Sequence, residues 1–221
     1  MRNFVMTSES VTRGHPDKLC DQISDAVVDA YLAAGLRAGV IVECALASGV
    51  TFLSVRTGAE APVDLAALTR QVMTEAGYPA ETPGGVPTVM MDLVHAAELA
   101  PDALDESRAR NMVSAFGYAC MDSPTAMPYP VEASHRIAAA LDAARAEDRL
   151  PWLSPDAQAQ VAVGFRDRRP VSLDAIALGF GHGELPTPEA MEAELVSQVI
   201  TPALTFGPLK MSGDTPLILL P

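Results

Sequence analysis

The chain has 221 residues, of which 49% are hydrophobic and 5% aromatic, and its formal net charge at neutral pH is −13. This length allows a substantial core in one large or two small domains. The acidic charge argues against a nucleic acid partner, because phosphate backbones need a basic surface. No segment approaches the roughly 20 apolar residues of a membrane span, and the first residues contain no apolar run suited to a signal peptide.

Three cysteines, Cys20, Cys44 and Cys120, lack the spacing of metal ligands. They are typical of reduced, mostly buried thiols in an intracellular protein. We therefore expect a soluble protein of the cytoplasm whose partners include neither nucleic acid nor membrane.

The stretch from Thr7 to Gly35 predicts a turn followed by a helix. Pro16 suits the first helical position, where its missing N–H is not needed. Apolar residues then recur at steps of three and four, and Asp21, Asp25 and Asp29 lie on the opposite side. The stretch therefore predicts an amphipathic helix that packs against a core.

Polar residues gather at the head of this predicted helix. Backbone N–H groups at a helix start attract anions, and His15 and Lys18 can neutralise phosphate charge. Asp17 or Glu9 can hold a hard cation that bridges phosphate oxygens. A capped helix with solvated charges explains the same pattern, so the residues alone leave both interpretations open. The gathered residues are Ser8, Glu9, Ser10, Arg13, His15, Asp17 and Lys18.

The rest of the first half predicts a β-hairpin, a helix and a third strand. Glycines bound these elements at the hairpin turn and after the helix. Residues 96–112 are polar and interrupted by Pro101, which predicts a loop or short helix. The predicted elements are strands Ala38–Ala47 and Gly49–Arg56, helix Val63–Ala76 and strand Val86–His95.

The second half repeats this order after an additional predicted strand. Ser154 to Asp156 predict a turn or cap, and the apolar tail from Leu209 to Pro221 needs a cover, either as a last strand or at a subunit interface. His95, His135 and His182 stand alone, and we expect structural roles for them. The predicted elements are strand Ser114–Met121, helix Val131–Ala146, strands Ala159–Phe165 and Val171–Phe180, and helix Pro188–Val199.

These elements predict an α+β fold of two similar α/β modules, with mixed or antiparallel sheets covered by helices. We expect a first module over residues 1–100 and a second over 113–221. Residues 101–112 are expected to form a mobile connection between them.

The strings TSESV, GHPDK and DQISDA in the opening stretch resemble the N-terminal signature of methionine adenosyltransferases, also called S-adenosylmethionine synthetases. Later strings follow in family order, among them FGYA at Phe116 to Ala119 and PDA at Pro155 to Ala157. The resemblance covers nearly the whole chain and implies the family's fold without its third domain. It likens residues 1–100 to the family's central domain and residues 113–221 to its N-terminal domain.

The resemblance also implies a site for ATP or a related nucleotide, Mg²⁺, K⁺ as a further candidate ion, and a homodimer or higher oligomer. Catalytic roles would fall on His15, which would stabilise the leaving phosphate, and on Lys18, which would steer the phosphates. Asp17 would hold the metal, and Glu43 would favour a monovalent cation. The implied nucleotide-binding residues are Ser8, Glu9, His15, Asp17 and Asp156.

Several positions depart from the family pattern. Arg56 stands where the family has a glutamate that binds the methionine ammonium, Leu99 replaces a glutamine, Asn111 an aspartate and Gln158 a catalytic lysine. The later GLTGRK and GGGAFS strings are absent. Each lost group of this kind typically costs roughly a hundred- to a thousand-fold in rate, so ordinary synthesis from methionine is not expected of this chain alone.

The pattern of matches and departures leaves three hypotheses. The first is a nucleotide-dependent transferase that attacks the ribose 5′ carbon of ATP with a second substrate other than methionine, or bound differently. Arg56 would then bind an anionic second substrate, because guanidinium pairs with carboxylate or phosphate, although it equally fits a surface strand end. The second is a non-catalytic binding or regulatory subunit that pairs with a full-length relative or with a chain supplying the missing domain. The third, a decayed copy, is disfavoured by the clean core strands.

Overall fold

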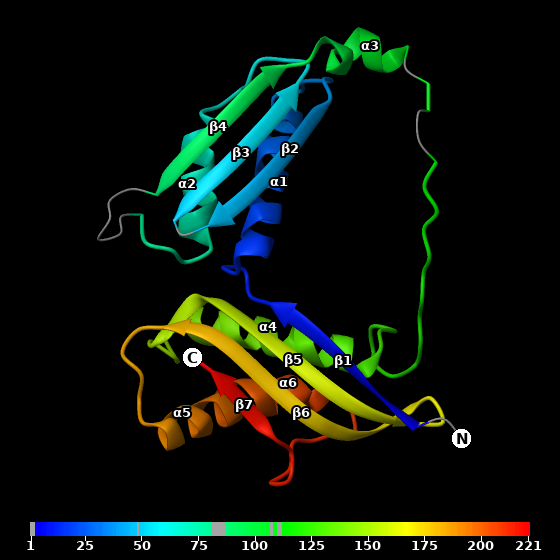
Figure 1. The fold of residues 1–221 in the computed structure, drawn as a ribbon, viewed down its shortest axis with the longest axis vertical. Coiled ribbons are helices and arrows are strands. Elements are labelled where there is room, and N and C mark those ends of the chain that lie inside the picture. The colour runs from blue at the N-terminus through cyan, green and yellow to red at the C-terminus, as the bar shows by residue number, and fades with distance from the viewer. Residues whose placement is uncertain (1–2, 48, 81–86, 107, 110–111) are drawn as a thin grey trace. The chain divides into compact units, whose positions relative to one another are not determined.

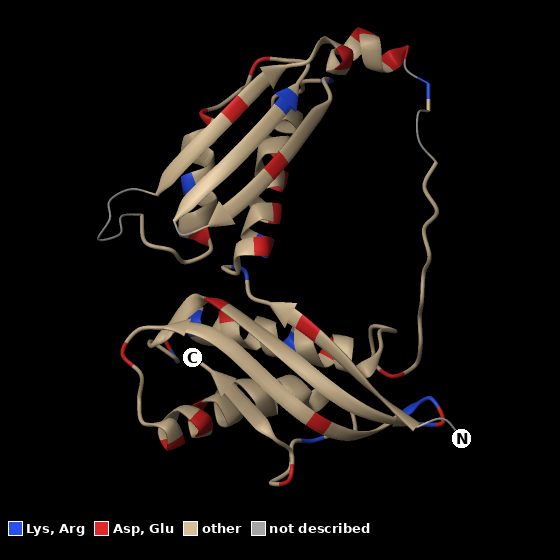
Figure 2. Cartoon of the chain, viewed as in Figure 1, with Lys and Arg blue, Asp and Glu red and all other residues tan. Residues whose placement is uncertain are grey.

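The structure is a computed structural model that describes residues 3–47, 49–80, 87–106, 108–109 and 112–221. It divides into two compact units. The four-stranded unit consists of Met1–His15 and Phe116–Pro221, and the three-stranded unit consists of Pro16–Ala115. Acidic residues are distributed over both units (Figure 2). None of the described helices is long and apolar enough to cross a membrane.

The three-stranded unit packs two helices on one face of a mixed sheet (Figure 1). The strand order is β2-β3-β4, with β2 antiparallel to β3 and β3 parallel to β4. Helix α1 buries Leu19, Ile23, Val27 and Tyr31 in the core that this sheet shares with α2. The elements are α1 (Pro16–Ala33), β2 (Val40–Ala47), β3 (Val50–Thr57), α2 (Leu65–Glu75), β4 (Thr88–His95) and the short helices η1 (Ala97–Leu99) and α3 (Pro101–Asp105).

The other face of this sheet carries exposed apolar side chains. Burial alternates along β2 and β3, as expected for strands with one covered face. Four large apolar residues on this face have at least two fifths of their surface exposed: Ile41, Phe52, Met90 and Val94. Exposed apolar side chains on an uncovered sheet face are typical of an interaction site.

The four-stranded unit has the strand order β1-β5-β6-β7. Strand β5 pairs antiparallel with β1 and with β6, and β7 is parallel to β6. Helices α4 to α6 cover one face of the sheet (Figure 1). The elements are β1 (Asn3–Val11), α4 (Tyr129–Ala146), β5 (Leu153–Arg166), β6 (Arg169–His182), α5 (Pro188–Leu195), η2 (Val196–Ile200), α6 (Thr201–Ala203), η3 (Leu204–Phe206) and β7 (Leu217–Leu220).

The two units repeat one motif, which confirms the prediction of two similar modules with mixed sheets. In each unit, a helix is followed by an antiparallel hairpin, by one or more further helices, and by a strand that is parallel to the second strand of the hairpin. The end of the apolar tail forms the last strand, β7, as one of the two expectations for the tail had stated. Strand β1 is an addition to the repeat, because it pairs with the outer edge of β5.

Strand β1 also corrects the expected module boundary. The first module was expected to contain residues 1–100, but residues 1–15 belong to the unit formed by the second half. Ser8 lies opposite Val161, and the rings of Phe4 and Phe165 stack with centroids 5.0 Å apart. The predicted turn before Pro16 is therefore wrong over residues 7–11, which are strand.

Two further local predictions differ from the structure. Residues 112–120 form neither helix nor strand, and Phe116 is 97% exposed, although their composition predicted a strand over Ser114–Met121. Ser154 to Asp156 lie within β5 rather than in a turn, because β1 and the loop after it bind this part of the chain. Of the expected mobile connection, residues 101–105 form α3, while residues 107, 110 and 111 lie outside the described part.

The buried carboxylate of Glu132 stabilises the start of α4 through hydrogen bonds. Glu132 is 7% exposed and accepts hydrogen bonds from Thr125 Oγ1 at 2.5 Å and from Arg136 Nε at 2.5 Å. The Arg136 guanidinium lies 4.8 Å from the centroid of the Phe206 ring. Burial raises the pKa of Glu132, but the Thr125 hydrogen bond and the Arg136 charge outweigh it and hold the pKa below its ordinary value.

Candidate functional site

The loop between β1 and α1 is fastened to the start of β5 by Thr12. The Thr12 backbone N–H donates to Ala157 O at 2.9 Å, and its hydroxyl donates to Pro155 O at 2.7 Å. The same hydroxyl accepts from the Ala157 N–H at 2.8 Å. His15 N donates to Thr12 O at 3.1 Å and closes a turn. These bonds place His15 beside β5.

Gly14 allows the loop to approach β5 closely. A Cβ at this position would lie 2.6 Å from Pro155 O and 2.7 Å from Pro155 C, closer than real side chains tolerate. On the other side, Arg13 N donates to Asp142 Oδ2 of α4 at 2.9 Å. The loop is therefore held between β5 and α4, and only glycine fits at position 14 without a shift of the backbone.

The fastened loop forms one wall of a pocket of about 220 Å³. This volume is below the roughly 300–1,000 Å³ of sites that enclose a whole drug-sized ligand, so the pocket suits one polar group of a larger molecule. The imidazole of His15 can donate a hydrogen bond or carry a positive charge, and the Asp156 carboxylate can bind a cation. The lining residues are His15, Asp156, Gln158, Gly179, Phe180, Gly181 and Leu220.

The structure thus brings together two of the predicted nucleotide-binding residues, His15 and Asp156. Gln158, which replaces the family's lysine, lines the same pocket. Gly179 makes room for it, because a Cβ there would lie 2.9 Å from Gln158 Nε2. Sequence reasoning gave no role to Thr12, Gly14 or Gly179. The GHPDK string contains Gly14, but its contact with Pro155 depends on a residue far along the chain.

Ser8 and Glu9 do not line this pocket. Both lie on β1 rather than at a helix start, and Glu9 accepts a long hydrogen bond of 3.5 Å from Gln160 Nε2. Their predicted placement rested on the turn that the structure replaces with strand. Ser10 contacts His135 through Oγ and Nδ1 at 3.0 Å, which gives His135 a structural partner.

Asp17 and Lys18 are exposed in the first turn of α1, directly after His15 in the chain. They belong to the three-stranded unit, as do Glu43 and Arg56. Within that unit Asp17 and Glu43, predicted to hold Mg²⁺ and a monovalent cation respectively, lie on different faces of the sheet. Helix α1 packs on the covered face of the sheet, whereas Glu43 lies on the exposed face. Among the described residues there is no group of three or more His, Cys, Asp or Glu that could hold a metal ion.

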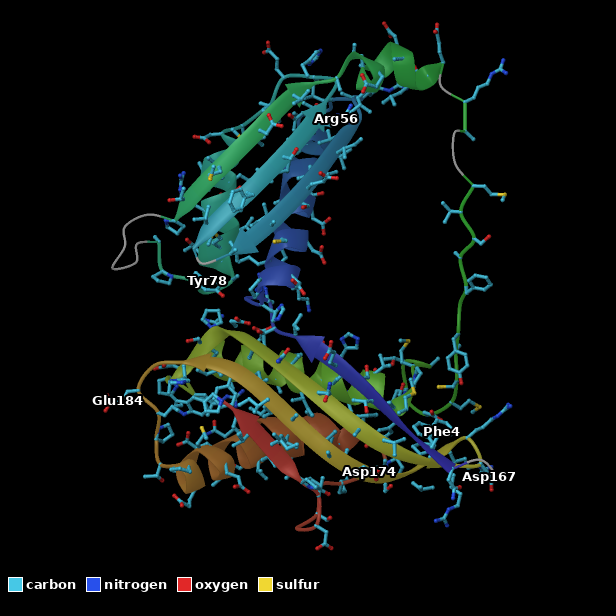
Figure 3. All side chains as sticks on the ribbon, viewed as in Figure 1. Phe4, Arg56, Tyr78, Asp167, Asp174 and Glu184 are labelled. Atoms are coloured by element: carbon cyan, nitrogen blue, oxygen red, sulfur yellow. The ribbon has the colours of Figure 1, made fainter. Side chains whose placement is uncertain are left out.

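Arg56 is already engaged within its own unit. Its Nη2 lies 2.7 Å from Glu98 Oε1, and the two side chains are 52% and 50% exposed. Figure 3 labels Arg56 near the end of β3. Glu98 is positioned by its neighbour Leu99, whose carbonyl accepts from Gly39 N at 2.8 Å. The ion pair neutralises the guanidinium, which the sequence predicted either to bind an anionic second substrate or to lie at a surface strand end.

A charge-swap cycle tests this pair. Arg56→Glu places two carboxylates together and is expected to lower the free energy of unfolding by up to about 1 kcal/mol, since exposed pairs contribute little. The double variant Arg56→Glu with Glu98→Arg should recover most of that loss. Urea denaturation of the single and double variants measures the coupling, and a double variant no more stable than the sum of the singles would contradict the contact.

Comparison with known proteins decides the family. Residues 3–98 match the model of the S-adenosylmethionine synthetase N-terminal domain, and residues 106–219 match the model of its central domain. The chain belongs to the S-adenosylmethionine synthetase family. The two matched domains follow in the reverse of the expected assignment, because residues 3–98 match the N-terminal and not the central domain.

Individual members of the S-adenosylmethionine synthetase family agree. The chain is 35% identical over 238 residues to the S-adenosylmethionine synthase of Synechococcus sp. (strain RCC307), a match that covers 97% of this chain and 58% of that protein. It is 34% identical over 237 residues to the synthase of Prochlorococcus marinus (strain MIT 9303), with 97% and 57% covered. The chain therefore spans somewhat more than half the length of these relatives.

Proposed function

We propose that this chain binds the phosphate end of ATP or a related nucleotide and takes part in a transferase reaction at the ribose 5′ carbon. The observation that carries the proposal is the pocket in which the Thr12–His15 loop holds His15 beside Asp156 and Gln158. Family membership supports a nucleotide-using reaction. Because the relatives carry the name of a synthase, an enzyme has better support than a regulatory subunit.

The reaction would be a displacement in which a nucleophile attacks the 5′ carbon and the phosphate chain leaves. His15 would donate a hydrogen bond, or its positive charge, to the leaving phosphate oxygen. Lys18, three residues after His15 in the chain, would attract the phosphates through its positive charge. The polar wall formed by Gln158 would orient a phosphate oxygen without adding charge, which is a weaker contribution than a lysine would make.

The residues present fit magnesium in the way that phosphate-binding sites usually hold it. Such sites use one or two carboxylates and leave the remaining positions to substrate phosphates and water. Asp156 would supply such a carboxylate in the pocket, and the family resemblance assigns a magnesium-binding role to Asp17 as well. When bound, the ion would neutralise phosphate charge.

The proposed potassium ligand, Glu43, has oxygen-bearing neighbours. On the exposed face of the sheet it lies opposite Ser54, which lies opposite Asp92. Oxygen ligands of this kind suit a hard cation. The exposed apolar side chains around this row would be buried in a homodimer or higher oligomer, which we propose for this face.

For the second substrate we propose a molecule other than methionine, or methionine bound differently. Arg56 and Glu98 together carry no net charge, so an anionic group must displace Glu98 to reach the guanidinium. Such an exchange favours a carboxylate or phosphate that can pair bidentately with Arg56.

Isothermal titration with ATP and Mg²⁺ tests the proposal. The unmodified chain should bind, and His15→Ala should weaken binding about tenfold or more, as expected for loss of a charge-assisted hydrogen bond. His95→Ala, in the three-stranded unit, is the matched control and should bind normally. Absence of heat with the unmodified chain at millimolar ATP would remove the proposal.

A further inference from the structure

A second, larger pocket in the four-stranded unit lies at the opposite end of β1 from His15. Its volume is about 760 Å³, within the roughly 300–1,000 Å³ range of small-molecule sites. The first residues of β1, the β5–β6 turn and the segment before α4 form its walls. Its lining includes Phe4, Tyr118, Cys120, Asp122, Phe165 and Arg168. Phe4 is labelled at this end of the sheet in Figure 3.

Three aromatic side chains contribute to the lining of this pocket. Phe4 and Phe165 stack in parallel, with an interplanar angle of 5°, while Phe4 remains 41% exposed. Tyr118 lines the same pocket and is 77% exposed. A planar ring entering the pocket would cover these faces and gain stacking as well as burial.

Two opposite charges complete the lining. Neither Asp122 nor Arg168 makes a side-chain hydrogen bond or ion pair with any residue in the described part of the chain. Guanidinium binds a carboxylate bidentately, and a carboxylate binds an ammonium group. An α-amino-acid head carries both of these groups and is therefore complementary to the pair.

The backbone conformation of the turn that carries Arg168 is energetically unfavourable. Asp167 and Arg168 connect β5 to β6 in a two-residue turn, with φ of 50° and 66°. Such turns favour Asn-Gly or Asp-Gly, because positive φ is unfavourable for residues with a Cβ. A glycine at position 168 would relieve the turn but would remove the guanidinium from the pocket.

We propose that this pocket binds a zwitterionic small molecule that combines an α-amino-acid head with a planar ring system. The ring lies against Phe4 and Tyr118, the ligand carboxylate pairs with Arg168, and its ammonium pairs with Asp122. This site is separate from the His15 pocket and does not depend on the proposed nucleotide reaction.

Cys120 supplies a direct readout, because its thiol lines the pocket and is half-buried. A bound ligand should slow its alkylation by iodoacetamide, followed by peptide mass spectrometry. Cys20, in the three-stranded unit, lies outside the pocket and reports on general thiol reactivity. Burial, together with the neighbouring Cys20 thiol, raises the pKa of Cys44 to about 12, so Cys44 should react slowly throughout.

L-tryptophan is the probe, with indole as the ring alone and L-alanine as the head alone. We expect L-tryptophan at about 10 mM to slow Cys120 alkylation several-fold, indole to protect less, and alanine not at all. Arg168→Gln and Asp122→Asn should each weaken protection about tenfold, the loss expected for one charge-assisted pair. Arg37→Gln, in the other unit, should protect like the unmodified chain.

The outcomes divide cleanly. Absence of protection by L-tryptophan in the unmodified chain would overturn the site. Equal protection by indole and L-tryptophan, or full protection in both the Arg168 and Asp122 variants, would overturn the zwitterion. Thermal unfolding of each variant at the temperature of the unmodified chain shows that the four-stranded unit, which carries both substitutions, is folded.

Discussion

Gly14→Ala is expected to reduce ATP binding by at least about a hundredfold, because the added methyl group would collide with the backbone of Pro155. The collision involves backbone O and C atoms at 2.6 and 2.7 Å, which cannot move away as a flexible side chain could. The loop must therefore leave β5, which breaks the Thr12 hydrogen bonds and removes His15 from Asp156. Displacements of about 1 Å in binding sites can cost this much.

Titration calorimetry with ATP and Mg²⁺ measures the effect of Gly14→Ala, and thermal unfolding reports whether the fold survives. Gly213→Ala is the matched control, since a Cβ at position 213 meets nothing within 4 Å. If Gly14→Ala bound ATP like the Gly213 variant, the loop would not be the element that forms the site.

The second large effect concerns Glu132. Glu132→Gln is expected to lower the free energy of unfolding at neutral pH by about 2 kcal/mol, because it removes the charge that pairs with Arg136 inside the protein. The loss should also depend on pH. The folded state holds the pKa of Glu132 below its ordinary value of 4.5, so its stabilising contribution is present above that value and disappears as the pH falls through the folded pKa.

Urea denaturation between pH 7 and pH 3 measures the free energy of unfolding of Glu132→Gln and of the unmodified chain. The two free energies should become equal as the pH falls. Glu184→Gln serves as the control, since Glu184 extends from the connection after β6 (Figure 3) and should change stability little at any pH. A difference between the Glu132 variant and the unmodified chain that stayed constant with pH would mean that the carboxylate is not ionised in the folded protein.

Local patterns predicted the helices and the two hairpins, but not the strands whose partners lie far away. Residues 7–11 read as a polar turn, yet Ser8 pairs with Val161 in the second half. Residues 114–121 have the composition of a strand but no neighbouring strand among the described residues. Whether a segment becomes a strand depends on an available edge, which its own composition does not reveal.

The candidate site was likewise predictable only in part, because the position of each residue depends on distant partners. His15 and Asp156 were both assigned to the nucleotide from family motifs, and they line one pocket. Glu9 was misplaced together with the turn, because its position on β1 depends on pairing with β5. The hydrogen bond from Arg56 to Glu98 joins positions on separate elements, so the spacing of charges in the sequence could not indicate it.

The order of strands has a consequence for synthesis on the ribosome. Strand β1 is translated well before its partner β5, which begins only at Leu153. At about 5–20 residues per second the nascent strand waits for roughly ten to thirty seconds. The three-stranded unit, Pro16–Ala115, is synthesised completely before β5 and can fold while β1 is still unpaired. If the ribosome stopped before Leu153, β1 would have no partner strand, and its Phe4 and Val5 would be accessible to chaperones. The three-stranded unit would already be folded at that point.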